Sequence, residues 1–271
     1  MAGAVTEAPL GRWEGEDAVG LARRWGSAGV HLFSSVGSTN DLARRLAAEG
    51  APSGTVVLAE EQLAGRGQAG RAWSSPPGLG LWTSLVVRPS SIPDPAVLPL
   101  LVGLEAAAVL DPFAAPDAVA VKWPNDLYLR GRKLGGILCE GAWEGDRPSH
   151  FVVGLGLNVL HAPADFPPRI AARATSLRGE AGDGMVDRLA VASAVIPALL
   201  RRLSGEVVLT EADRAALAAR DLLLGREVEV TEPATGAFLA RGVAGGVSAE
   251  GALVVEGRPF RSGTVRLAEP A

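Results

Sequence analysis

Residues 65–71, "GRGQAGR", are the part of the sequence best suited to binding an anion, and Trp73 follows them closely. Glycine accepts positive φ angles and lets a backbone approach a ligand. Arg66 and Arg71 each carry a planar fork of donors that fits carboxylate and phosphate oxygens. The segment therefore predicts a loop that closes over an anionic ligand. On these residues alone, the alternative is a glycine-rich turn with two solvated arginines.

A second polar group opens an expected helix, "STNDLARRLAAEG", at residues 38–50. Its apolar residues recur with helical spacing, and Gly50 ends the pattern. Asn40 or Thr39 is the expected cap. The positive end of the helix dipole would favour a polar or anionic ligand beside these hydroxyl and amide groups, although capping alone also explains them.

The segment "KWPNDLYLRGRKLGG" at residues 122–136 combines a turn with a lysine. We expect a strand to end at Pro124, with Asn125 and Asp126 in the turn beyond it and Lys133 leading into the next strand. A plain turn and a solvated lysine would explain this pattern. The functional alternative is a lysine held toward a pocket by its small neighbours.

The segment "VVGLGLNV" at residues 152–159 places Gly154 and Gly156 on one face of a strand, because side chains alternate along a strand. Glycine weakens a strand, so a face bare of side chains predicts that something flat or bulky packs there. A bulge or a close contact with a helix is the alternative.

The elements that must position these groups predict an α+β fold. The expected strands cover residues 54–61, 78–89, 118–126, 133–145 and 150–160, and further expected helices cover residues 96–111, 186–203 and 211–220. From about residue 221, short alternating runs split by glycine indicate a small antiparallel β-barrel. We therefore predict an N-terminal lead-in at 1–29, either loose or a short helix, a catalytic domain with a central mixed β-sheet at 30–220, and the barrel domain at 221–271.

Composition narrows the class of protein. A net charge of −4 and a pI near 5.5 argue against general nucleic-acid binding. The single cysteine, Cys139, cannot form a disulfide within the chain, and the N-terminus lacks the pattern of a secretory signal. The apolar stretch at 96–110 is shorter than the roughly 20 residues of a membrane span. The sequence predicts a cytoplasmic protein with no membrane or nucleic-acid partner.

Taken in order, the motifs resemble those of the biotin–protein ligases. The chain carries "STN" at 38–40, "EQLAGRGQAGRAWSSP" at 61–76, "KWPND" at 122–126, "KLGGILCE" at 133–140 and "GLGLN" at 154–158, in the order and near the spacings of that family. The resemblance covers about 30–265. It implies a catalytic domain of the biotin/lipoate ligase type with a small C-terminal SH3-like β-barrel, and no N-terminal repressor domain, for which residues 1–30 are too few.

The resemblance also implies the reaction and its partners. Biotin and ATP, with Mg²⁺, would give biotinyl-5′-AMP and pyrophosphate, and a lysine of a biotin carboxyl carrier domain would then accept biotin and release AMP. The enzyme would work as a monomer or a homodimer. A lipoate–protein ligase is the nearest alternative enzyme, and a biotin or nucleotide sensor that transfers nothing is the alternative outside enzymes.

Site residues follow from the resemblance position by position, and no metal ligand is assigned. The expected catalytic residues are Lys133, Arg66 and Asp126. The expected biotin contacts are Ser38, Thr39, Asn40, Gln62, Arg66, Gly67, Gln68, Lys133, Gly154 and Gly156. The expected nucleotide contacts are Gly65, Arg66, Gly67, Arg71, Trp73, Asn125, Asp126 and Asn158. A role for Asp126 in orienting the acceptor amine is inferred from its charge, since a lysine amine is mostly protonated near neutral pH.

Gln68 departs from the family's pattern, which has a second arginine at this position of the loop. The change removes a fixed positive charge beside the expected adenylate. We hypothesise that biotinyl-AMP is held less tightly and escapes to label lysines unselectively, unless Arg88 or Gln68 itself replaces the contact.

Overall fold

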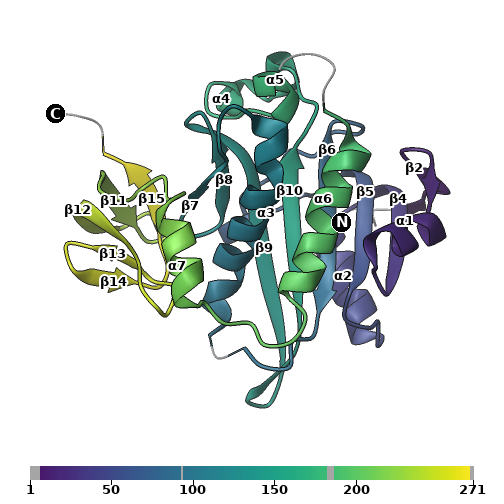
Figure 1. Ribbon diagram of the computed structural model, residues 1–271, viewed down its shortest axis with the longest axis horizontal. Coiled ribbons are helices and arrows are strands. Elements are labelled where there is room, and N and C mark those ends of the chain that lie inside the picture. Colours follow the sequence, from purple (N-terminus) through teal and green to yellow (C-terminus); the bar gives the residue numbers. More distant parts are fainter. Residues whose placement is uncertain (1–6, 93, 182–185, 269–271) are drawn as a thin grey trace.

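An eight-stranded sheet forms the centre of the computed structural model, which describes residues 7–92, 94–181 and 186–268 (Figure 1). Its strands, in spatial order, are β1 (Ala8–Pro9), β4 (Gly29–Val36), β5 (Thr55–Gln62), β6 (Gly80–Val87), β10 (Arg147–Asn158), β9 (Arg132–Glu144), β8 (Asp126–Leu129) and β7 (Ala120–Lys122). Strands β4 and β5 pair in parallel and the other neighbours are antiparallel. The predicted mixed sheet is thus confirmed.

Helices cover both faces of this sheet, because its central strands are apolar on both sides. The helices are α1 (Ala18–Trp25), α2 (Thr39–Ala48), α3 (Leu98–Ala114), α4 (Pro168–Ala171), α5 (Leu177–Ala181), α6 (Arg188–Arg202) and α7 (Glu211–Ala218). Along β5, Val56 and Leu58 pack in the core that contains α1, α3 and α6, whereas Val57 and Ala59 pack with α2. This alternation is the two-residue period of a strand buried on both faces.

Helix α3 is the apolar helix of the core. The helical segment Pro95–Ala114 is 20 residues long, with a mean hydropathy of 1.7, which is enough to cross a membrane by length and composition alone. It is longer than the apolar stretch predicted from the sequence. Half of its apolar window is buried inside the protein, and α3 lies beside α6 on one face of the sheet (Figure 1).

From residue 7 onward, the N-terminal lead-in is folded and contributes to the main unit, whereas residues 1–6 lie outside the described part of the chain. Besides the anticipated helix, which is α1, β1 pairs with β4 at the sheet edge, and β2 (Arg12–Trp13) pairs with β3 (Glu16–Asp17). Trp13 and Trp25 are buried edge to face, with ring centroids 6.4 Å apart. The buried Arg188 of α6 bonds Glu60 and Glu14 and lies over the Trp13 ring, which fixes this segment against the sheet.

The C-terminal residues form the predicted antiparallel β unit. Its strands are β11 (Glu227–Thr231), β12 (Phe238–Val247), β13 (Leu253–Val255), β14 (Arg258–Phe260) and β15 (Thr264–Leu267), in the order β14-β13-β12-β11-β15. Within the described residues, β14 and β15 do not pair with each other, so strand pairing alone does not close a barrel. The unit lies beside β7, and the border predicted at 220/221 falls between α7 and β11, where it stays a prediction.

The expected elements are present with small shifts at their ends, and two local details differ. Ser38, rather than Thr39 or Asn40, is the N-cap residue of α2, although its hydroxyl makes no capping bond. Asp126 is the first residue of β8 instead of part of the turn, because it pairs with Gly136 of β9.

Candidate functional site

One cavity of about 730 Å³ lies beside the N-terminal end of α2, and residues from all five motifs line it. Every site residue predicted from the sequence lines it except Gly65. A side chain at Gly65 would meet the Trp73 carbonyl oxygen at 2.7 Å, so this glycine serves the close approach of the loop's own strands.

The lining of this cavity is strongly cationic, although the chain carries a net charge of −4. Among the described lining residues, Asp126 is the only carboxylate. The described lining includes seven cationic side chains, namely Arg66, Arg71, Lys122, Lys133, Arg173, Arg226 and Arg266. Such a surface favours ligands with more than one negative charge.

The glycine–arginine loop is a short hairpin over the cavity. Gln62 N–H donates to the Ser75 carbonyl at 3.2 Å, Trp73 N–H to Gly65 at 2.8 Å, and Gly67 N–H to Arg71 at 2.7 Å. The tip at Gln68–Gly70 is a 3₁₀ turn in which Ala69 adopts a φ of 53°. Arg71 reaches from this hairpin to the Thr264 hydroxyl of β15, 3.5 Å away, so the C-terminal unit forms the opposite rim.

Gln62 and Thr39 meet on the floor of the cavity. The Gln62 amide oxygen accepts the Thr39 backbone N–H at 2.9 Å and lies 3.0 Å from the Thr39 hydroxyl. The Gln62 amide nitrogen donates to the Ser75 hydroxyl at 2.8 Å. Gln62 therefore fixes the first turn of α2 to the hairpin, and both side chains predicted to contact biotin are held in place before any ligand binds.

Ser84 joins these groups to Asn40. Its hydroxyl oxygen lies 2.8 Å from the Thr39 hydroxyl and 2.6 Å from the Asn40 amide oxygen. With the Thr39–Gln62 contact, there are three short oxygen–oxygen contacts in a row. Only the Thr39 and Ser84 hydroxyls can donate a proton to them, so two of the three can be hydrogen bonds at one time. If Thr39 donates to Ser84 and Ser84 donates to Asn40, the Gln62 oxygen still receives the Thr39 N–H. The Gln62 oxygen then has a lone pair to accept from a ligand N–H.

Asn40 fills the space that Gly154 leaves on the sheet. Gly154 pairs with Ser84 across β10 and β6, and a Cβ at Gly154 would lie 2.2 Å from the Asn40 amide oxygen. The Asn40 amide nitrogen donates to Glu140 at 2.8 Å and to the Leu138 carbonyl at 3.2 Å. The bare strand face predicted from the sequence is therefore covered here by a side chain of the protein.

Trp73 fills the matching space at Gly156. Gly156 pairs with Gly136 across β10 and β9, and a Cβ at Gly156 would lie 2.6 Å from the Trp73 indole nitrogen. The indole N–H is buried and has no partner among the described residues. The Lys133 ammonium lies 5.3 Å from the centre of the indole ring, within the range of a cation–π contact.

Lys133 and Asp126 form an ion pair at the strand edge, with 2.5 Å between the ammonium and a carboxylate oxygen. The buried Asn125 donates to the Ile137 carbonyl at 2.6 Å, which fastens the turn to β9. Asn158 is likewise buried and donates to the Thr175 carbonyl at 3.0 Å. The two asparagines therefore hold backbone in place, whereas Lys133 contacts both the Asp126 carboxylate and the Trp73 indole.

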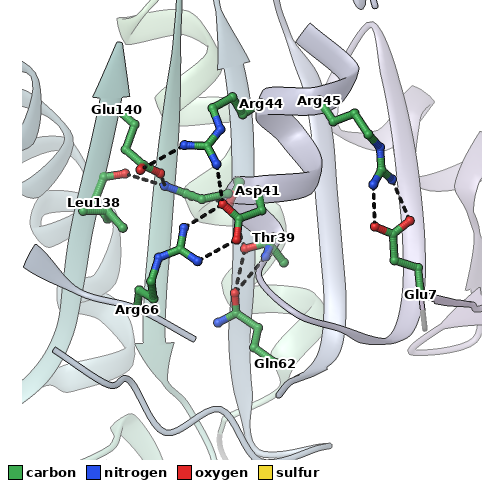
Figure 2. Close-up of polar contacts among 11 residues, drawn as sticks. Glu7, Thr39, Asp41, Arg44, Arg45, Gln62, Arg66, Leu138 and Glu140 are labelled. Atoms are coloured by element: carbon green, nitrogen blue, oxygen red, sulfur yellow. Dashed lines mark hydrogen bonds and ion pairs between the residues drawn. The ribbon is translucent and has the colours of Figure 1, made fainter. Parts of the chain in front are cut away.

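Arg66 pairs with Asp41 of α2 through both terminal nitrogens, at 2.6 and 2.7 Å (Figure 2). Gln68 lines the cavity next to it. Arg88 cannot take over a contact at Gln68, because its guanidinium donates to the Ala47, Ala51 and Ser149 carbonyls. Of the two groups considered as replacements for the family's second arginine, only the Gln68 side chain itself remains.

Several residues of the site have no role assigned from the sequence. Lys122, the first residue of the 122–126 motif, is half-buried and donates to the Val265 carbonyl at 2.7 Å, and burial lowers the pKa of its ammonium group. His161 stacks on Phe166 with ring centroids 4.8 Å apart, and burial lowers its pKa to about 4, so its ring is neutral at pH 7. Ser84 was missed because its partners, Thr39 and Asn40, become its neighbours only when α2 packs on β6. Burial raises the pKa of the Cys139 thiol, which opposes a role as nucleophile.

Comparison with known proteins agrees with this geometry. Residues 32–158 match the model of the biotin/lipoate A/B protein ligase family. The biotin–acetyl-CoA-carboxylase ligase of Paracoccus denitrificans is 34% identical over 233 residues, which cover 83% of this chain and 93% of that protein. This chain belongs to the biotin/lipoate A/B protein ligase family.

Two further relatives are similar to this chain, one in sequence over part of its length and one in structure. The bifunctional ligase/repressor BirA of Bacillus subtilis (strain 168) is 42% identical over 167 residues, and this match spans 60% of the chain and half of that protein. The biotin protein ligase of Aquifex aeolicus, solved in complex with biotin and ATP, superposes with a TM-score of 0.72 at 26% identity. It covers 88% of this chain and 99% of its own.

A metal ion bound in this biotin/lipoate A/B protein ligase would be coordinated mainly by oxygen atoms of a bound substrate. Within residues 7–92, 94–181 and 186–268, no group of three or more histidine, cysteine or acidic side chains is arranged to hold one. The single lining carboxylate, Asp126, is paired with Lys133. Mg²⁺ often binds through one or two carboxylates and substrate phosphates, so the site fits Mg²⁺ that arrives on a nucleotide.

Proposed function

We propose that this chain activates biotin with ATP and transfers it to a lysine of a biotin carboxyl carrier domain. The observation that carries the proposal is the convergence of five separate motifs on one cation-rich cavity. The name of the Paracoccus relative, which aligns over nearly its whole length, supports biotin as the substrate. The ligand pair named for the Aquifex structure supports ATP as the second substrate.

In the first step, a biotin carboxylate oxygen would attack the α-phosphorus of ATP. The bond to the bridging oxygen of the β-phosphate would break, giving biotinyl-5′-AMP and pyrophosphate. Catalysis of such a step consists mainly of positioning and of positive charge where negative charge develops. We assign this task to Lys133, which lies over the Trp73 indole, and to Arg66, with Arg71 at the rim.

In the second step, the acceptor lysine amine would attack the acyl carbon of the mixed anhydride. A C–N bond would form, and AMP would leave with the electrons of the broken C–O bond. The amine must first lose a proton. Asp126 is the only lining carboxylate among the described residues and is our candidate to orient this amine, which requires Lys133 to exchange Asp126 for the phosphate as the nucleotide binds.

On this proposal, the polar floor at Thr39 and Gln62 would bind the ureido ring of biotin, and Trp73 would contact the adenine. Mg²⁺, bound to the ATP phosphates, would neutralise charge on the leaving pyrophosphate, with Asp126 as the nearest protein carboxylate. The partner would be a biotin carboxyl carrier protein or domain, and the site of action would be the cytoplasm.

The decisive experiment is biotin transfer to a purified carrier domain with ATP and Mg²⁺, measured by intact mass. Wild-type protein should add one biotin, and Lys133→Met should lose most of this activity. Arg132→Gln is the matched control, because Arg132 is the preceding residue of β9 but pairs with Glu180 outside the cavity. Its activity should stay close to that of the wild type.

Each other outcome identifies an alternative. A folded protein that binds biotin but gives neither transfer nor biotin-dependent pyrophosphate exchange would be a sensor. Exchange that depends on lipoate in place of biotin would assign it to the lipoate ligases of the same family.

A further inference from the structure

Asp41 is the only anionic partner of Arg66 among the described residues. The carboxylate lies in the first turn of α2 and outside the cavity lining, whereas Arg66 lines the cavity. The pair is bidentate, since each terminal nitrogen of the guanidinium donates to a different carboxylate oxygen (Figure 2). The hydrogen bonds from Arg66 hold the pKa of Asp41 below its ordinary value, so the pair is fully ionised at neutral pH.

This geometry leaves a second edge of the guanidinium available. Arginine has five N–H donors, and the contact with Asp41 uses one on each terminal nitrogen. The Nε donor and the remaining terminal donors have no protein partner in the described part of the chain. One guanidinium can therefore hold Asp41 on one edge and a ligand anion on the other.

The charge of Asp41 is balanced a second time by Arg44, which donates to it at 2.7 Å. Arg44 also lies 3.6 Å from Glu140, and Glu140 accepts from Asn40 at 2.8 Å (Figure 2). Asp41, Arg44 and Glu140 all lie outside the cavity lining. Asp41 is thus fixed from behind by a network that a ligand does not have to disturb.

We propose that Asp41 is a positioning residue: it fixes the Arg66 guanidinium so that its free edge binds an anionic oxygen of the substrates. The proposal rests on the proposed function, since it assumes that biotin carboxylate or ATP phosphate binds in this cavity. Either anion offers the same chemistry to Arg66, and the experiment separates them.

In the opposite role, Asp41 would compete with the ligand for Arg66. That role predicts the opposite change in ligand affinity when Asp41 is replaced. Removing the negative charge of a competitor would tighten anion binding. Removing a positioning residue would weaken it, because the guanidinium would lose its orientation before the ligand arrives.

The test is a double-mutant cycle of Asp41→Asn and Arg66→Ala, read by calorimetric titration with biotin alone and with Mg·ATP alone. Asp41→Asn should weaken binding of one of these ligands by about tenfold in the wild-type background, the range of one hydrogen bond to a charged group. In the Arg66→Ala background the same change should have no effect, because its route through Arg66 is gone. A merely structural effect on α2 would persist in both backgrounds.

The chain supplies a matched control on the same helix. Glu7 forms a bidentate pair with Arg45 of α2 at 2.8 and 2.6 Å (Figure 2), and neither residue lines the cavity. Glu7→Gln removes an equivalent ion pair and should leave both titrations unchanged. Asp41→Glu, which keeps the charge but lengthens the side chain, should recover part of the affinity and guards against misfolding of Asp41→Asn.

The other outcomes overturn the proposal. Tighter binding by Asp41→Asn would make Asp41 a competitor, and an equal loss in both backgrounds would make its role structural. Unchanged binding of both ligands by Asp41→Asn would remove any role. Wild-type protein that binds neither biotin nor Mg·ATP would contradict the proposed function itself, and the role of Asp41 would fall with it.

Discussion

Ser84 links Thr39 to Asn40 in the polar floor of the cavity. It is fully buried and is the only donor to the Asn40 amide oxygen among the described residues. Ser84→Ala leaves this oxygen without a donor, and a buried unsatisfied polar group costs about 1–3 kcal/mol. We expect the free energy of unfolding in urea to fall by that amount, and biotin to bind more weakly as Thr39 and Asn40 lose their link.

The neighbouring hydroxyl of Thr83 provides the comparison. It is equally buried but donates to the Val57 carbonyl, on the opposite face of β6 from Asn40. Thr83→Val keeps the side-chain volume and leaves Asn40 satisfied, so its effect on unfolding should be smaller. If the two variants lose equal stability, the special position of Ser84 is not supported.

His161 makes stability depend on pH because it is buried as a neutral ring. Burial lowers its pKa to about 4 in the folded state, while the unfolded value is about 6.5. The unfolded chain therefore binds the extra proton between these values, and stability falls as the pH falls through this window. From these two pKa values, stability should fall by about 2 kcal/mol between pH 7.5 and pH 5.

His161→Leu should remove this part of the pH dependence, measured as the difference in urea unfolding free energy between pH 7.5 and pH 5. The pKa of His150 is also lowered by burial, but His150 is present in both proteins and cancels in the comparison. An unchanged difference in the variant would show that His161 does not remain neutral in the folded protein.

At the scale of elements, the glycines of β9 and β10 make room for side chains of the protein itself. A methyl group at Gly156 would lie 2.6 Å from the Trp73 indole nitrogen and displace the ring. Overpacking of this kind costs about 1–3 kcal/mol. Gly156→Ala should therefore lower the unfolding free energy and also weaken ATP binding, since Trp73 is our candidate for the adenine contact.

Gly103 in α3 is the contrasting glycine. A methyl group there meets Ile137 and Val121 at an ordinary 3.5 Å. Because glycine is unfavourable inside a helix, Gly103→Ala should stabilise the protein by up to about 1 kcal/mol. Thermal unfolding should show a lower melting temperature for Gly156→Ala and a higher one for Gly103→Ala than for the wild type.

Most elements could be predicted because their signals are local. The strand pattern of 54–61, the helical stripe after Ser38 and the hairpin of 133–160 are each contained in a few consecutive residues. Ion pairs and cross-strand partners are not, since they depend on which strands become neighbours. The sequence placed Gly154 and Gly156 on a bare face correctly, but Asn40 and Trp73 as their occupants follow only from the sheet order.

The candidate site shows the same division. Its motif residues, such as Lys133 and Gln62, could be found from the family's pattern, whereas Ser84 and His161 could not. Lys122 lies in a motif, but its partner could not be predicted, because its ammonium group is held by a carbonyl of β15, more than a hundred residues away along the chain.

At the scale of the whole molecule, the two units share one core. Buried residues of the C-terminal sheet belong to the same apolar cluster as α3 and the main sheet. Trp123 donates to the Gly251 carbonyl at 3.0 Å across the junction. We expect a single calorimetric unfolding transition, with equal calorimetric and van't Hoff enthalpies.

Trp123→Phe should lower the temperature of that one transition as a whole. Arg261→Gln, which removes the exposed ion pair with Asp94 at the same junction, should leave it nearly unchanged. Two separate transitions in the wild type would mean that the units unfold independently.

The seven cations around one cavity also decide what the protein must discriminate. Their attraction acts on every polyphosphate in the cell, so guanine nucleotides, free pyrophosphate and inorganic phosphate all enter the same field as ATP. Charge then sets how fast anions arrive and how strongly the product pyrophosphate inhibits. Selection among purines depends on uncharged groups such as Trp73 and the turn at Asn125. Higher salt should therefore slow the capture of all these anions, and it should leave the preference between ATP and GTP intact, because these two carry the same charge.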